Sequence, residues 1–152
     1  MNKEIKVLYI DDEVHNLTAF KATFRRDFKI FTASSGFEGI NILENNEINV
    51  IITDQRMPQM TGVEFLEYII PIYPDIMRIL LTGYSDITAV VDAINKGKIF
   101  YYHQKPWDEN ELKITIENAF QLFKLRRENK ELTEKLQVSN EQLEFMLRQK
   151  LL

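Results

Sequence analysis

Five short apolar runs alternate with amphipathic segments through the first 107 residues of the chain. Each run is rich in β-branched or aromatic residues, which is typical of β-strands. The runs are IKVLYI (5–10), FKIFTA (28–33), VIIT (50–53), MRILLT (77–82) and IFYY (99–102). Because strands that alternate with helices form a parallel sheet with helices on both faces, the pattern predicts a doubly wound, five-stranded α/β domain with right-handed crossovers.

The first, third and fourth runs are nearly continuous stretches of apolar residues. Such stretches indicate strands that are covered on both faces. The second and fifth runs contain more polar residues, and we expect them nearer the edges of the sheet.

Four amphipathic segments separate the runs and are expected to form the covering helices. Pro71 and Pro74 end the third segment, and Gly97 is a suitable residue for the end of the fourth. The apolar positions of the segments are Val14, Leu17, Phe20, Ala22 and Phe24; Phe37, Ile40 and Leu43; Val63, Phe65, Leu66 and Ile69; and Ala89, Val90, Ala93 and Ile94.

The last 45 residues, from Asp108 onward, contain neither glycine nor proline and predict one long helix. Asp108 is a suitable N-cap, with Glu111 three residues later as in a capping box. The first part of this helix can pack on the sheet through a set of apolar residues. These are Leu112, Ile116, Ala119, Phe120 and Phe123.

Further along, the apolar residues of this helix follow alternating steps of three and four, the a/d pattern of a coiled coil. The seam consists of Leu122, Leu125, Asn129, Leu132, Leu136, Ser139, Leu143 and Met146. A buried Asn129 at an a position favours two strands in a fixed register, whereas Ser139 and Lys150 weaken the seam toward its end. We therefore expect a globular domain at 1–121 and a dimeric coiled-coil extension at 122–152. The alternative is a solvated extension of the last domain helix.

Composition excludes several classes of protein. The chain is 45% hydrophobic and carries a net charge of −4, which suits one globular domain and disfavours generic nucleic-acid binding. It lacks cysteine, which excludes disulfides and thiolate-ligated metals and fits a cytoplasmic protein. No apolar run approaches the roughly 20 residues of a membrane span, and no DNA-binding helix-turn-helix is present.

Three carboxylates lie at the ends of two predicted strands. Asp11 and Asp12 follow the first strand, and Asp54 follows the third. In an open parallel sheet, ligands bind beyond the carboxyl ends of the strands, where the strand order reverses. With the common order 2-1-3-4-5, these three residues would converge on one pocket. Close carboxylates repel one another, and a hard cation such as Mg²⁺ or Mn²⁺ removes that conflict.

Two further strand ends carry chemically suitable groups. The fourth strand ends in Thr82, and Lys105 lies just after the fifth. A carboxylate can act as a covalent nucleophile, while a cation and a lysine neutralise phosphoryl charge. Taken singly, Asp54 is most simply a cap, Thr82 a strand residue and Lys105 a surface charge. The set, arranged at four strand ends, predicts a site that forms an aspartyl phosphate.

The motifs YIDDE, IITDQRMPQMTG, ILLTGYSD and YYHQKPW resemble the receiver domain of bacterial two-component response regulators over roughly residues 4–120. The resemblance implies the strand order 2-1-3-4-5. It implies that Asp54 is the phosphoacceptor, that Thr82 and Lys105 contact the phosphoryl group and that Tyr102 is the switch aromatic. It also implies the ligands of Mg²⁺ or Mn²⁺. These are Asp12 and Asp54 directly, Asp11 mostly through water, and the backbone carbonyl of Arg56.

The resemblance extends to partners and outputs. It implies a sensor histidine kinase or phosphotransfer protein as phosphodonor and a cis Lys105–Pro106 bond. The homodimer through the C-terminal helix is predicted by the heptad seam, and an output domain absent from this chain is expected to follow it. More narrowly, the motifs look like receivers that feed cyclic-dinucleotide phosphodiesterase, phosphatase, cyclase or kinase outputs. Arg56 and Tyr84 are expected at the pocket mouth.

Two other functions remain open from the sequence. One is a stand-alone dimeric regulator or scaffold that acts through protein contacts. The other is an aspartate-based phosphatase, which resembles a pattern with a second Asp two positions after the nucleophile. Arg56 occupies that position, which counts against turnover. The only chemistry expected is autophosphorylation from a phosphodonor and slow autodephosphorylation.

Overall fold

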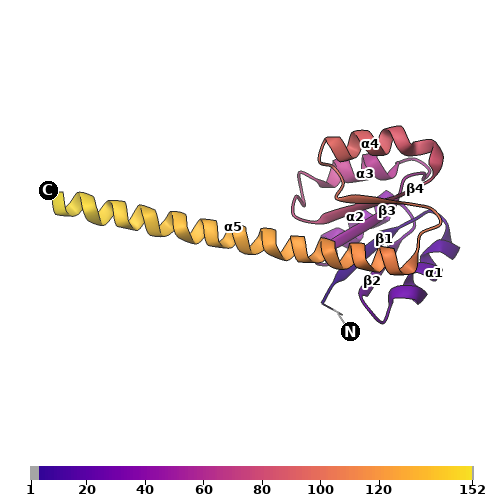
Figure 1. Ribbon diagram of the computed structural model, residues 1–152, viewed down its shortest axis with the longest axis horizontal. Coiled ribbons are helices and arrows are strands. Elements are labelled where there is room, and N and C mark those ends of the chain that lie inside the picture. Colours follow the sequence, from indigo (N-terminus) through magenta and orange to yellow (C-terminus); the bar gives the residue numbers. More distant parts are fainter. Residues whose placement is uncertain (1–3, 152) are drawn as a thin grey trace.

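A computed structural model describes residues 4–151, apart from the side chain of Tyr84. It contains one five-stranded sheet in the order β2-β1-β3-β4-β5, with every neighbouring pair parallel (Figure 1). The predicted fold and strand order are confirmed. The strands are β1 (Lys6–Ile10), β2 (Lys29–Ala33), β3 (Val50–Asp54), β4 (Met77–Thr82) and β5 (Tyr101–Gln104).

Helices cover both faces of this sheet, as predicted. They are α1 (Val14–Phe24), α2 (Gly36–Asn45), α3 (Gly62–Ile69), α4 (Ile87–Asn95) and α5 (Glu109–Leu151), with a short 3₁₀ helix η1 (Tyr84–Asp86) before α4. One hydrophobic cluster joins α1 and α5 to one face, and a second cluster joins α2, α3 and α4 to the other. The three layers hold the strand ends, and therefore the carboxylates, in fixed positions.

The helix ends follow the local chemistry of the sequence. Ser35 accepts a hydrogen bond from Glu38 N at the start of α2, and Asp108 accepts one from Glu111 N at the start of α5. Gly97 has a φ of 71°, and its N–H donates to Ile94 O, which closes α4 as the sequence predicted.

The predicted fifth strand was displaced by two residues. The run IFYY (99–102) predicts a strand that begins at residue 99, but β5 begins at Tyr101 and ends at Gln104. Ile99 is buried and packs with the second hydrophobic cluster before the strand starts. The polar end of β5 lies at the edge of the sheet, where it needs no continuous apolar pattern.

Several residues predicted on the apolar faces of helices are exposed. Val14 at the start of α1 is 66% exposed, and Phe37 at the start of α2 is 58% exposed. Ala22 and Ala89 are also exposed. The buried stripe of α1 is narrower than predicted and consists of Phe20 and Phe24, with Leu17 partly buried against the same cluster.

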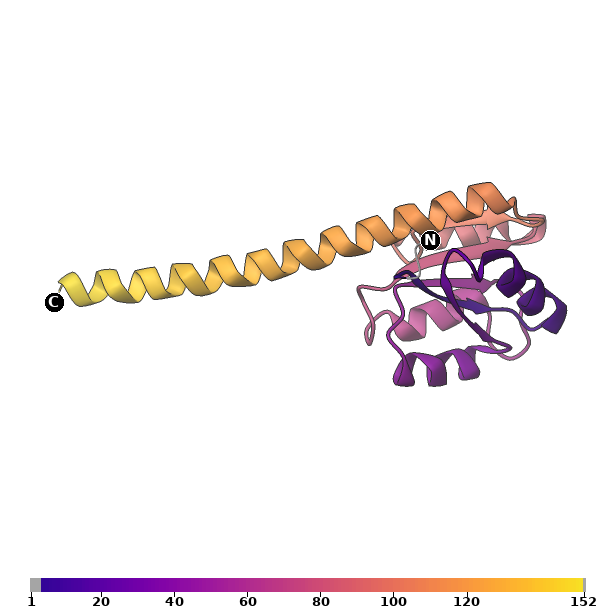
Figure 2. The same ribbon diagram turned by 90° about the horizontal axis from the view of Figure 1, so that it is seen from below.

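Helix α5 extends far beyond the sheet as a single element of 43 residues (Figures 1 and 2). Its buried residues are the five that the sequence predicted: Leu112, Ile116, Ala119, Phe120 and Phe123. Ion pairs from Arg127 to Glu47 (3.3 Å) and from Lys130 to Asp75 (4.0 Å) connect it to the base of the domain. Beyond Phe123, every described residue of α5 is exposed.

None of the described helices is both long and apolar enough to cross a membrane.

Candidate functional site

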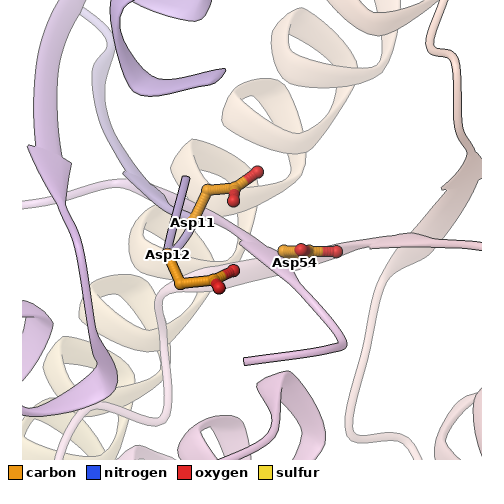
Figure 3. A group of neighbouring side chains, drawn as sticks. All are labelled: Asp11, Asp12 and Asp54. Atoms are coloured by element: carbon orange, nitrogen blue, oxygen red, sulfur yellow. The ribbon is translucent and has the colours of Figure 1, made fainter. Parts of the chain in front are cut away.

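The three predicted carboxylates meet at the carboxyl ends of β1 and β3. One oxygen from each of Asp11, Asp12 and Asp54 lies within 4.8 Å of the others. Figure 3 shows Asp11 and Asp12 on the segment after β1 and Asp54 at the end of β3. Asp11 is fully buried, Asp54 is 8% exposed, and Asp12 is exposed. The pocket therefore opens to solvent on the side of Asp12.

Lys105 connects the two buried carboxylates. Its Nζ lies 3.1 Å from Asp54 Oδ1 and 3.4 Å from Asp11 Oδ2. Its backbone N–H donates to Thr82 O at 2.9 Å, which ties the segment after β5 to the end of β4. The Lys105–Pro106 bond is cis, as the resemblance implied.

Charge balance in the pocket shifts the pKa values of two groups. Burial raises the pKa of Asp54, although Lys105 opposes the shift. Burial alone would lower the pKa of Lys105, but the hydrogen bond and charge of Asp54, together with Asp11, outweigh it and raise this pKa. Lys105 therefore does not fully offset the burial of the Asp54 carboxylate.

Asp11 makes contacts that sequence reasoning missed. Its Oδ2 accepts hydrogen bonds from Tyr9 Oη (2.7 Å) and Asn16 Nδ2 (3.0 Å), and its Oδ1 accepts one from Glu13 N (3.0 Å). Burial, followed by the hydrogen bond to Asp11, raises the pKa of Tyr9, so the phenol stays protonated and acts as the donor. Tyr9 lies two residues before Asp11, on the same face of an extended segment. That spacing was the available signal.

Thr82 is fully buried at the end of β4. Its hydroxyl donates to Gly83 O at 3.1 Å. Tyr102 is half-buried on β5 and pairs with Leu80 in the sheet register, whereas Thr82 pairs with Gln104. Thr82 and Tyr102 are therefore diagonal neighbours on one face of adjacent strands.

The side chain of Arg56 turns toward the β4–α4 connection. Its Nε donates to Asp86 Oδ2 at 3.1 Å and its Nη2 donates to Ser85 Oγ at 2.6 Å. This side chain is 71% exposed, so the ion pair adds little stability. The contacts nevertheless place Arg56 beside the loop that leads away from Thr82. The side chain of Tyr84, expected beside it, lies outside the described residues.

The loop after Asp54 is tightly packed. Gln55 Oε1 accepts a hydrogen bond from Val63 N, and Gly62 N donates to Gln55 O. A Cβ atom on Gly62 would collide with the backbone carbonyl oxygen of Asp54. Glycine at this position lets α3 begin directly against the end of β3, which fixes the backbone around Asp54.

The donor set fits a hard divalent cation. The three clustered groups offer oxygen atoms alone, and one of them reaches solvent. Mg²⁺ prefers oxygen ligands, commonly one or two carboxylates with waters and phosphate oxygens in the remaining positions. The pocket thus combines an oxygen-only carboxylate cluster with Lys105 beside Asp54, and the buried Thr82 ends the neighbouring strand β4.

Comparison with known proteins places this site in context. The model of the response regulator receiver domain family matches residues 7–117. The hydrogenase transcriptional regulatory protein HoxA of Cupriavidus necator is 34% identical over 150 residues, which are 99% of this chain and 31% of that protein. HoxA of Bradyrhizobium diazoefficiens is 33% identical over 80% of this chain and 25% of its own length. The chain thus spans less than a third of these relatives.

Solved structures show the same fold. A response regulator receiver domain protein from Clostridium thermocellum is 37% identical with a TM-score of 0.76, covering 80% of this chain and 98% of its own. A protein from Rhodopirellula baltica described as an adenylate cyclase is 29% identical with a TM-score of 0.84. That comparison covers 89% of this chain, so it reaches into the long helix, and 99% of the other chain.

Proposed function

Because the chain belongs to the response regulator receiver domain family, we propose that it is a signalling switch that accepts a phosphoryl group on Asp54. The observation that carries this proposal is the contact of Lys105 Nζ with Asp54 Oδ1 at 3.1 Å, beside the Asp11–Asp12–Asp54 cluster. Asp54 is the last residue of β3, a buried strand at the centre of the sheet, and it retains a little access to solvent. A sensor histidine kinase or phosphotransfer protein is the proposed phosphodonor.

In the proposed reaction, a carboxylate oxygen of Asp54 attacks phosphorus. A P–O bond forms as the bond between phosphorus and the donor's leaving group breaks, and the electron pair stays with that leaving group. Lys105 is already within reach of Asp54 Oδ1 and can pair with a phosphoryl oxygen. Preorganised positive charge of this kind stabilises the transition state.

Asp12 and Asp54 are the proposed direct ligands of Mg²⁺ or Mn²⁺, with the Arg56 backbone carbonyl, and Asp11 acts mostly through water. When bound, the cation supplies positive charge that neutralises the transferring phosphoryl group. Asp12 is the exposed member of the cluster, which leaves it free to bind a hydrated cation.

Thr82 and Tyr102 are the proposed switch residues. To bind a phosphoryl oxygen, the Thr82 hydroxyl must leave Gly83 O, its present acceptor. Tyr102 is a diagonal neighbour on the same face of the sheet, so a shift of Thr82 changes the space next to its ring. The surface formed by α4, β5 and α5 exists in two conformations, and phosphorylation shifts the population from one to the other.

Labelling by a small phosphodonor tests the proposed function. We expect acetyl phosphate to phosphorylate the wild-type chain in the presence of Mg²⁺, and we expect EDTA to stop the reaction. The Asp54→Ala variant should not be labelled. An unlabelled wild-type chain with metal present would refute the proposal, whereas multiple-turnover hydrolysis of a small phosphoester would favour a phosphatase.

Substituting Tyr102→Ala should separate phosphorylation from its consequences. The ring lies outside the carboxylate cluster, so labelling of Asp54 is expected to remain within about twofold of wild type. The beryllofluoride-induced change in amide NMR shifts of α5 should disappear, because no aromatic ring would remain to move into the space that Thr82 leaves. Tyr68→Phe is the control, and loss of labelling in Tyr102→Ala would contradict the switch role.

The exposed part of α5 is proposed to pair with a second copy of the chain as a parallel coiled coil. Leu122 is half-buried against the domain. The aliphatic seam residues Leu125, Leu132, Leu136, Leu143 and Met146 are 55–64% exposed in the single chain. A row of exposed apolar residues at heptad spacing is stabilised when a partner helix covers it. The proposed division is a receiver domain at 1–121 and a coiled-coil extension at 122–152, with Asn129 fixing the register.

A charge placed on this seam should prevent dimerisation. Leu132→Glu would bury a carboxylate at a d position, so the dimer dissociation constant is expected to rise at least about tenfold. Gln137→Glu introduces the same charge at a b position and serves as the control. Sedimentation equilibrium at several concentrations measures both. Equal dissociation constants for Leu132→Glu and wild type would show that the seam is not the interface.

The similarity to HoxA of Cupriavidus necator covers the long helix as well as the domain, and that relative is a longer transcriptional regulator. We propose that α5 transmits the switch to an output module. The alternative is a scaffold that dimerises without regard to phosphorylation. A dimer whose affinity and solution scattering are unchanged by beryllofluoride would favour the scaffold.

A further inference from the structure

The Asp11 carboxylate is held by more hydrogen bonds than its part in the proposed cation site requires. Its Oδ2 has three donors: Tyr9 Oη at 2.7 Å, Asn16 Nδ2 at 3.0 Å and Lys105 Nζ at 3.4 Å. Its Oδ1 accepts from Glu13 N at 3.0 Å. A carboxylate oxygen has about two lone pairs, so Oδ2 is already saturated.

The ring of Tyr9 has little freedom to move. It is 1% exposed and stacks on Phe20, with the ring centroids 4.2 Å apart and the planes at 16°. Phe20 in turn makes a T-shaped contact with Trp107, with ring centroids 5.9 Å apart, and packs beside Phe24 at a centroid distance of 4.9 Å. Because this aromatic cluster fixes the ring, the hydroxyl of Tyr9 is delivered to one point, namely Asp11 Oδ2.

Asn16 approaches the same oxygen from another element. It lies in the first turn of α1, and its Nδ2 also donates to Glu13 Oε2 at 3.3 Å. Tyr9 from β1 and Asn16 from α1 therefore both donate hydrogen bonds to Asp11 Oδ2. Neither residue is part of the Asp11–Asp12–Asp54 cluster.

We propose that Tyr9 and Asn16 are positioning residues that lock the orientation of Asp11 before a cation binds, and so favour Mg²⁺ over larger cations. This inference rests on the proposed function, since it assumes cation binding at the carboxylate cluster. Mg²⁺ demands near-ideal octahedral geometry, whereas Ca²⁺ tolerates variable geometry and more ligands. A carboxylate that cannot rotate suits the first cation better than the second.

Isothermal titration calorimetry of Mg²⁺ and Ca²⁺ with the full chain tests the proposal. Partners that orient a direct metal ligand typically contribute about 10–100-fold to metal affinity. Because Asp11 is proposed to act mostly through water, we expect a contribution at the lower end of that range. We expect Tyr9→Phe to raise the Mg²⁺ dissociation constant about tenfold while the Ca²⁺ constant changes by at most about twofold. Tyr68→Phe, which removes a hydroxyl from an exposed ring on α3, should leave both constants unchanged.

Asn16→Ala provides a second, independent variant. It is not expected to destabilise α1, because alanine has a higher helix propensity than asparagine. It should also raise the Mg²⁺ constant, and the double variant should raise it further. Unchanged Mg²⁺ constants in these variants would overturn the proposal. An equal rise of both dissociation constants would show that the two residues affect cation binding in general and not the preference for Mg²⁺, and it would also overturn the proposal. If the wild-type chain itself binds no Mg²⁺, the proposed cation site fails first.

Discussion

Replacing Asp54 by Asn is expected to abolish phosphoryl acceptance and to raise the melting temperature of the metal-free protein. The amide removes the nucleophile and nearly preserves the shape of the side chain. It also removes one of the carboxylates of the pocket, while Lys105 keeps its partner Asp11 at 3.4 Å. The burial that raises the pKa of Asp54 means that its ionised form opposes folding above that raised pKa.

The sign of the pH effect follows from that raised pKa. Between the unfolded-state pKa and the folded-state pKa of Asp54, the folded chain binds more protons than the unfolded chain. The destabilisation by this group is therefore complete above the folded pKa, and it is relieved as the pH falls from the folded pKa to the unfolded pKa. The Asp54→Asn substitution would remove this dependence, because the amide does not titrate.

Thermal unfolding with EDTA, followed by circular dichroism, measures the effect. The increase for Asp54→Asn should be on the order of a few degrees. Mg²⁺ should stabilise the wild-type chain more than the variant, because the cation loses a ligand. Asp92→Asn, a change at an exposed carboxylate on α4, is the control for both labelling and stability. A lower melting temperature for Asp54→Asn would mean that Asp54 is fully compensated in the folded protein.

Replacing Lys105 by Met is expected to have the opposite effect on stability and a large effect on phosphorylation. The variant leaves the buried Asp11 and Asp54 without their shared cation, which should cost about 1–3 kcal/mol of unfolding free energy. Loss of one preorganised electrostatic contact to a transition state typically reduces a rate about 100- to 1000-fold. Acetyl phosphate labelling should slow by that order.

The Mg²⁺ affinity of Lys105→Met distinguishes a loss of transition-state stabilisation from general damage to the pocket. With the positive charge removed, the carboxylates should bind Mg²⁺ at least as tightly as in the wild-type chain, by calorimetry. Lys96→Met, which removes an exposed lysine paired with Asp92 on α4, is the control. Wild-type labelling rates in Lys105→Met would remove Lys105 from the proposed chemistry, and a weaker Mg²⁺ affinity would point to a disrupted pocket.

The sheet was largely predictable from the sequence, because buried parallel strands require continuous apolar runs. The predicted bounds of β4 match the structure, and Asp11, Asp12 and Asp54 do meet where β1 and β3 end. The edge strand β5 was misplaced, since an edge strand beside α5 tolerates polar residues and an apolar run can belong to the preceding loop. The burial of α5 was predicted correctly because its apolar residues recur at helical spacing.

The groups that surround the carboxylates were harder to predict. Tyr9 looks like an ordinary core residue in an apolar run, and only its hydroxyl and its position two residues before Asp11 distinguish it. Asn16 reaches Asp11 through the way α1 packs, which no short sequence motif encodes. The turn of the Arg56 side chain toward Ser85 and Asp86 depends on two loops about 30 residues apart in the chain. Contacts of this kind need the tertiary structure.

The position of the phosphoryl group tests the proposed function most directly. The wild-type chain would be treated with acetyl phosphate and Mg²⁺, reduced with borohydride to convert acyl phosphate to homoserine, digested and mapped by mass spectrometry. We predict homoserine at position 54 alone, with Asp11 and Asp12 unmodified. Homoserine at another aspartate, or undiminished modification at position 54 when EDTA replaces Mg²⁺, would contradict this function.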